Sequence, residues 1–182
     1  MSAKKLAFSA IFICFAAALS VLETMLPPIV PIEGIRIGLG NIVTMFLLYI
    51  GGNWRASDAL AVIILRCFLA ALIVGSPIRA VYGLTGGAAA WCAMLGARKI
   101  FPKKDEKPDP KYLPFVAVFG SVSHIAGQML AAVFFYGTRS VLAYTPILLA
   151  SALIGGVFTG FLTMLILAKL PKGLKKNIQT VK

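Results

Sequence analysis

The sequence predicts an all-α integral membrane protein, a single domain of six transmembrane helices spanning residues 1–182. Two observations carry this prediction. Hydrophobic residues make up 59% of the 182-residue chain, and charged residues make up only 13%, about half their share of an average soluble domain. A membrane-spanning helix needs roughly 20 predominantly apolar residues, and apolar runs that could serve as spans recur six times.

The first span is expected at 6–25. Its apolar stretch is long for a signal peptide, and cleavage near Ser20 would have only a weak small-residue site, which favours a retained helix. Three prolines and three glycines between residues 27 and 40 break any helix. They predict a loop or re-entrant segment before the second span, at 35–50. The apolar run from Ile42 to Ile50 is too short to span without the residues that precede it.

The remaining spans are expected at 59–74, 81–95, 115–136 and 141–167. A polar loop at 98–112 and a basic tail at 169–182 are expected to be solvated parts of the same domain. The three cysteines are an odd number and each lies in an apolar run. They are therefore expected to pack as small hydrophobic side chains rather than form disulfides.

The charge pattern predicts the orientation. The net charge is +12, but a nucleic-acid partner would need basic residues clustered on one folded face, and none is expected. With six spans, fourteen of the eighteen basic residues fall on one side: Lys4, Lys5, Arg55, Arg98, Lys99, Lys103, Lys104, Lys107, Lys111, Lys169, Lys172, Lys175, Lys176 and Lys182. The positive-inside rule then makes both termini cytoplasmic.

The four other basic residues are all arginines. Arg66 lies near the middle of the third span, where insertion of arginine costs roughly 2.5–3.5 kcal/mol unless it meets a partner, a water-filled cavity or a ligand. The alternative is an internal pairing that holds helices in register. Arginine grips carboxylate or phosphate with two parallel hydrogen bonds. Arg36, Arg66 and Arg79 are therefore predicted to line a path for an anionic ligand, whereas the interpretation for Arg139 is that it only anchors a loop.

Other polar residues are expected near this path. Ser121, His124 and Gln128 share one stripe of the fifth span, which indicates either a cavity-facing stripe or ordinary hydrogen-bonded packing. No second histidine exists, which argues against a His-rich metal site. Asn41 is expected to face the site.

The proline- and glycine-rich segment is the candidate lid or outer gate, with Glu33, Arg36 and Gly38 as its residues. Irregular backbone at membrane depth is tolerated only where it is buried in protein or lines a cavity. An ordinary external loop is the alternative for the two charges.

Small residues recur at helical spacing on three spans. They are Ala3, Ala7, Ala10, Cys14 and Ala17 on the first span, the pair Gly83 and Gly87, and the pair Gly156 and Gly160. Such faces let helices approach closely in lipid. Internal packing is the default interpretation, with docking onto another membrane subunit as the alternative for the first span.

Three patches resemble the bacterial Gx transporter family, also labelled heptaprenyl diphosphate synthase component I. They are Gly34-Ile-Arg-Ile-Gly-Leu-Gly-Asn-Ile-Val-Thr, the Leu-Arg pair at 65 and 66, and Ser-His-Ile-Ala-Gly-Gln from Ser123. The resemblance covers the chain from the first span through the sixth. The family's patterned positions match Gly38, Asn41, Arg66, His124 and Gln128.

That family in turn resembles the six-helix substrate-binding (S) subunits of energy-coupling factor transporters. This likeness implies that residues 34–41 belong to a region covering an outward-facing site. It also implies that Ala3 and Ala7 dock onto a membrane coupling subunit that works with separate ATPases, and that the chain resides in the bacterial inner membrane.

The synthase label is not matched by synthase chemistry. Prenyl synthases hold magnesium with clusters of acidic residues, and the one cluster here, at residues 105–109, contains Pro108 and is flanked by lysines. No Gly-Lys-Ser or Gly-Lys-Thr loop is present for ATP. The chain is therefore predicted not to be an enzyme and to carry no cofactor.

The function expected from these observations is a membrane transporter, or the substrate-binding subunit of one, for a small anionic or amphipathic solute. Its substrate-binding residues are predicted to be Asn41, Arg66, Arg79, His124 and Gln128. The alternative is a non-catalytic membrane subunit that supports polyprenyl diphosphate or quinone synthesis, or a flavin-linked redox system, through a soluble partner. A membrane enzyme acting alone ranks third because no acid/base constellation is evident.

Overall fold

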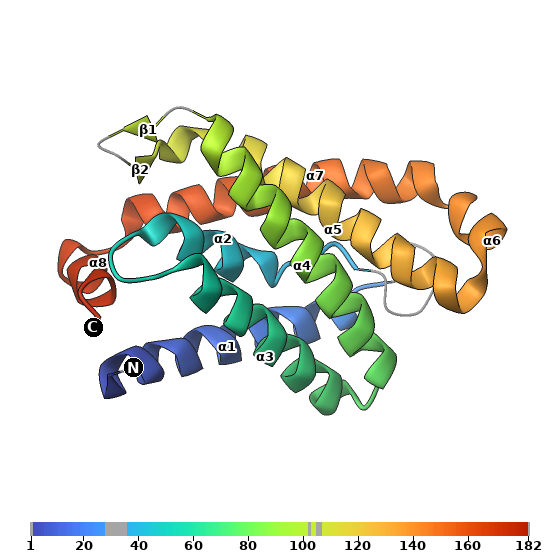
Figure 1. Ribbon diagram of the computed structural model, residues 1–182, viewed down its shortest axis with the longest axis horizontal. Helices are drawn as coiled ribbons and strands as arrows, with labels where there is room; N and C mark the ends of the chain where they lie inside the picture. The colour runs from blue at the N-terminus through green and yellow to red at the C-terminus, as the bar shows by residue number, and fades with distance from the viewer. Residues whose placement is uncertain (1, 28–35, 102, 105–106, 182) are drawn as a thin grey trace.

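The computed structural model describes residues 2–27, 36–101, 103–104 and 107–181. These residues form a helical bundle (Figure 1). Five helical segments are long and apolar enough to cross a membrane, as expected of a multi-pass membrane protein: α1 (Ala3–Thr24), α3 (Ala56–Val74), α4 (Pro77–Ile100), the segment Pro110–Tyr136 and α7 (Thr145–Lys169). The fourth of these comprises the short 3₁₀ helix η1 (Pro110–Tyr112) and α5 (Leu113–Tyr136).

The shorter elements complete the chain. α2 (Asn41–Ile50) is an apolar helix of ten residues, and α6 (Thr138–Leu142) joins α5 to α7. The strands β1 (Lys103–Lys104) and β2 (Lys107–Pro108) pair antiparallel in the polar loop between α4 and α5. α8 (Lys172–Gln179) lies in the basic tail.

α2 differs from the span expected at 35–50, because its helix begins only at Asn41. Gly38 has φ +91, a left-handed conformation that glycine adopts easily and that a helix cannot contain. Ten helical residues extend about 15 Å, half the thickness of a bilayer core. All ten side chains of α2 are buried, which suits a helix that is apolar on every side at the centre of a bundle.

Glycines bring the long helices together. A Cβ atom built on Gly83 or Gly87 of α4 would lie within 3.0 Å of Cys67 or Ile63 of α3. On α7, Gly156 and Gly160 approach the backbone of α5 equally closely. The internal packing expected of these two pairs is confirmed.

The small-residue face of α1 behaves differently. Ala17 is buried, but Ala3, Ala7, Ala10 and Cys14 are exposed on the outside of the bundle. All three cysteines are free.

Both chain termini lie at the same end of the bundle (Figure 1). Near the N-terminus, Lys5 Nζ pairs with Asp58 Oδ2 at 2.7 Å, at the start of α3. Near the C-terminus, the Trp54 indole N–H donates to the Ile178 carbonyl at 2.9 Å, and the Asn53 N–H donates to the Gln179 carbonyl at 3.0 Å. The loop that precedes α3, together with the first turn of α3, therefore holds both terminal helices.

The close approach of α7 to α5 predicts that Gly160→Ala destabilises the bundle. The new Cβ would lie 2.5 Å from Pro114 Cα and 2.8 Å from Ala117 Cβ, and such overpacking costs about 1–3 kcal/mol. The unfolding temperature in detergent should fall. Gly96→Ala on α4 is the matched control, because its Cβ would meet nothing within 4 Å. Equal melting temperatures for the two variants would contradict this packing.

Candidate functional site

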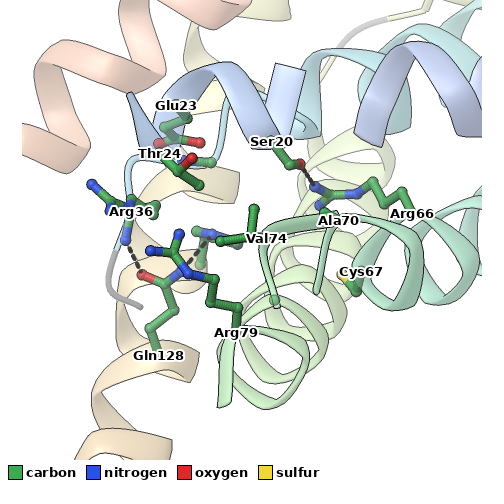
Figure 2. Close-up of a pocket in the computed structure, with 13 residues that line it drawn as sticks. Ser20, Glu23, Thr24, Arg36, Arg66, Cys67, Ala70, Val74, Arg79 and Gln128 are labelled. Atoms are coloured by element: carbon green, nitrogen blue, oxygen red, sulfur yellow. Dashed lines mark hydrogen bonds between the residues drawn. The ribbon is translucent and has the colours of Figure 1, made fainter. Parts of the chain in front are cut away.

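A pocket lies where α1, α3, α4, α5 and the segment before α2 meet (Figure 2). Its residues on α1 and α3 lie toward the ends of these two helices that are far from the chain termini. Its cavity volume is about 60 Å³. It is lined by Ser20, Glu23, Thr24, Arg36, Gly38, Arg66, Cys67, Ala70, Val74, Arg79, Gly83, His124 and Gln128.

Arg66 is the deepest charge of the pocket, with only 3% of its surface exposed. Its guanidinium donates from Nη1 to Ser20 Oγ at 3.0 Å and from Nη2 to Asn41 Oδ1 at 2.8 Å. Its Nε is buried without a hydrogen-bond partner among the described residues. Both partners are neutral, and no carboxylate of the described chain lies within ion-pair distance of this guanidinium.

Two glycines let the chain pass against Arg66 and His124. A Cβ on Gly40 would overlap the Arg66 Nη1 atom, and one on Gly38 would lie 2.8 Å from His124 Nε2. The positive φ of Gly38 adds a conformational reason for glycine at that position. Residues 38–40 can therefore lie directly on the polar groups of α3 and α5.

Glu23 fixes this segment from the side of α1. Its Oε1 accepts the Gly38 N–H at 2.7 Å, and its Oε2 accepts the Leu39 N–H at 3.0 Å. Only 4% of the residue is exposed. The carboxylate thus satisfies two backbone donors that lie inside the bundle, where unpaired donors are costly.

Gln128 links the segment to His124. Its Oε1 accepts the Arg36 backbone N–H at 3.1 Å, which leaves its Nε2 facing His124 Nε2 at 3.0 Å (Figure 2). The amide nitrogen can only donate, so His124 Nε2 must accept and the ring proton resides on Nδ1. This arrangement holds His124 as a neutral imidazole.

Arg79 projects into the pocket from the first turn of α4, beside Gln128 (Figure 2). Its Nε is buried and has no hydrogen-bond partner in the described part of the chain. No ion pair joins this side chain to a carboxylate of residues 2–27, 36–101 or 109–181. Arg66 and Arg79 therefore bring two guanidinium groups, from adjacent helices, to one pocket.

The structure brings most of the predicted site residues together. Arg36, Gly38, Arg66, Arg79, His124 and Gln128 line the pocket, and Asn41 bonds directly to Arg66. Ser121 is buried on the same stripe as His124 but does not line the pocket. Ala3 and Ala7 lie exposed near the other end of α1. Glu33 lies outside the described residues.

The contribution of α1 was not anticipated from the sequence. Ser20, Glu23 and Thr24 share one helical face and line the pocket together. The sequence contains a pattern that could have indicated this contribution, because these three polar residues lie at helical spacing at the end of an otherwise apolar span. This pattern is a weak indication of a site, because polar residues at the end of a span ordinarily face water.

The pocket has the chemistry of a binding site. Guanidinium groups suit carboxylate or phosphate oxygens. Among the described residues, no group of three or more His, Cys, Asp or Glu could hold a metal ion.

A comparison with protein families matches residues 12–166 to the family model described as heptaprenyl diphosphate synthase component I. The matched range runs from α1 to α7 and includes every residue that lines the pocket. Neither the search of curated proteins nor the search of solved structures found a match. The family model covers most of the chain, and the chain therefore belongs to the heptaprenyl diphosphate synthase component I family.

Proposed function

We propose that this chain is the substrate-binding subunit of a membrane transport system and that it takes up a small anionic solute. The observation that carries the proposal is the pair Arg66 and Arg79. Both line one pocket, and among the described residues neither lies within ion-pair distance of a carboxylate. A cation kept inside a membrane protein at this cost normally has a functional partner. An oxyanion from outside the chain is the partner that two guanidinium groups fit.

The segment from Arg36 to Gly40 is proposed as the lid of this site, together with Glu33. It precedes α2 and contributes Arg36 and Gly38 to the pocket lining, and it is held by Glu23 and Gln128 through backbone N–H groups. A lid held by a few hydrogen bonds can open without unpacking a helix. The residues proposed to contact the solute are Arg66, Arg79, His124 and Gln128, with Asn41 holding Arg66 in place.

We also propose six crossings, in the bacterial inner membrane, with both termini in the cytoplasm. α1 and α3 both begin at the end where Lys5 meets Asp58, so the chain between them must return across the bundle. The segment 36–40 and α2 together make this return: Gly38 contacts Glu23 at the pocket, whereas the Ile50 carbonyl accepts from Gln179 at the terminal end. Non-helical backbone at membrane depth is tolerated where it lines a cavity, and it recurs at the binding sites of transporters.

This topology predicts the result of terminal reporter fusions. A fluorescent protein that folds only in the cytoplasm should be bright when fused before Met1 or after Lys182, and a phosphatase active only outside should be inactive there. Insertion of the phosphatase after Gly137, between α5 and α6, should restore its activity. An active phosphatase at either terminus would contradict the proposed orientation.

Energy for uptake would come from partners. The exposed Ala3 and Ala7 on α1 form a smooth surface near the cytoplasmic end in this topology, which supports docking of a membrane coupling subunit that works with separate ATPases.

Binding of an endogenous anion can be tested by native mass spectrometry of the gently extracted protein. The wild-type chain should carry a small-molecule adduct, and the double variant Arg66→Gln, Arg79→Gln should lose at least about tenfold in occupancy because two charge-assisted contacts are removed. The control is Arg55→Gln, which removes an exposed arginine at the opposite end. An adduct that persists in the double variant would refute the site assignment.

The family description favours a second candidate, a membrane subunit that recruits a soluble polyprenyl diphosphate synthase. It would dock at the basic end, through the loop at 98–112 and the lysines of α8. Replacement of Lys103, Lys104, Lys107 and Lys111 by glutamine should then abolish co-purification with the synthase while leaving the pocket's adduct unchanged. Co-purification that survives the replacement, or that never occurs in the wild type, would eliminate this candidate.

A further inference from the structure

We propose that the solute is a small organic anion that carries, beside its oxyanion group, at least one hydrogen-bond donor, a hydroxyl or an ammonium. The inference rests on the proposed function and defines the chemical class of its ligand. It follows from the hydrogen-bonding groups of the two pocket walls, because one wall offers mainly acceptors and the other mainly donors.

The wall formed by α1 offers acceptors. The Ser20 hydroxyl donates its hydrogen to the Ala16 carbonyl at 2.9 Å, and the Thr24 hydroxyl donates to the Val21 carbonyl at 2.6 Å. Each hydroxyl has one hydrogen, so both oxygens act toward the pocket as acceptors, and Ser20 Oγ already accepts from Arg66 Nη1 at 3.0 Å. Glu23 adds carboxylate oxygens, each of which accepts one backbone N–H and retains further lone pairs.

The wall formed by α3, α4 and α5 offers donors. Arg66 retains its buried Nε–H, Arg79 contributes its guanidinium, and Gln128 has a second amide hydrogen beyond the one directed at His124. Figure 2 shows Glu23 and Thr24 projecting from α1 on one side of the pocket and Arg79 and Gln128 on the other. The oxyanion group belongs on the donor side.

The pocket also has a short apolar surface, made by Cys67, Ala70 and Val74 of α3 and Gly83 of α4. It would accommodate a few carbon atoms. The ligand thus has a short carbon body with an oxyanion at one end and a donor directed at α1.

A simple oxyanion with no donor would fit only half of this site. On binding, it would remove water from Glu23 and Thr24 without offering them a hydrogen, and a buried polar group left unsatisfied costs about 1–3 kcal/mol. A site built to bond a substrate hydroxyl or amine therefore discriminates strongly against the analogue that lacks it.

The test uses two matched ligand series on the purified full-length protein, with affinities measured by isothermal titration calorimetry. The carboxylate series is propionate, lactate and alanine, and the phosphate series is propyl phosphate, glycerol 3-phosphate and phosphoethanolamine. Within each series the members carry no donor, a hydroxyl or an ammonium. A donor-bearing member should bind at least about tenfold more tightly than the plain member, equivalent to 1.4 kcal/mol. Comparison between series identifies the oxyanion.

Variants of the α1 wall then test which residues cause the preference for donor-bearing ligands. Thr24→Val and Glu23→Gln should each reduce the ratio of donor-bearing to plain affinity by at least about fivefold, because each removes acceptor capacity from the α1 wall. Thr85→Val is the control, since Thr85 makes the same kind of hydroxyl-to-backbone bond on α4 and does not line the pocket. Thr24→Val leaves Glu23 and its hydrogen bonds to Gly38 and Leu39 intact. The affinity ratio can therefore be measured in this variant even if Glu23→Gln does not fold.

The outcomes separate the two claims. Plain members that bind within about twofold of their donor-bearing partners, or a preference that survives in Thr24→Val, would overturn the inference while leaving anion binding in place. If no member of either series binds to the wild-type protein, the proposed function falls together with the inference.

Discussion

The burial of the Arg66 guanidinium is the constraint on which the rest of this structure depends. A cation inside a membrane protein needs partners, and the described chain supplies neutral oxygens from Ser20 and Asn41 rather than a carboxylate. To reach Arg66, α1 must place Ser20 against α3, and α2 must begin at the depth of the pocket. The non-helical backbone before Asn41 is therefore part of the site, because it lets α2 begin beside Arg66.

Close approach through glycine makes this arrangement possible. Gly38 and Gly40 occupy positions where a Cβ would collide with His124 or Arg66. The same principle operates on the far sides of the pocket, where Gly83 and Gly86 of α4 contact Cys67 and His124. Polar groups of four helices and one irregular segment thus meet in a space that larger residues would fill. The Glu23 carboxylate of α1 bonds the backbone of the irregular segment, and among the described residues neither Arg66 nor Arg79 forms an ion pair with it.

Much of this site could be predicted from the sequence, because polar residues inside apolar spans are conspicuous. Arg66, His124 and Gln128 stand out for that reason, and the glycine-rich approach to Asn41 marks irregular backbone. Glu23 could not be recognised in the same way, since a charge at the end of a span is ordinary and its role depends on contacts with residues 15 and 16 positions later. The start of α2 could not be predicted from the sequence either. The apolar run at 42–50 predicts a helix, but only the structure shows that Gly38 has a positive φ, which a helix cannot contain.

An experimental structure of the gently extracted protein with its native solute would test the central claim most directly. The account predicts non-protein density in the pocket, with an oxyanion within hydrogen-bonding distance of Arg66 Nε and the Arg79 guanidinium, and with a donor directed at Glu23 or Thr24. A pocket holding only water, with Arg66 or Arg79 ion-paired to a carboxylate of the chain itself, would contradict it.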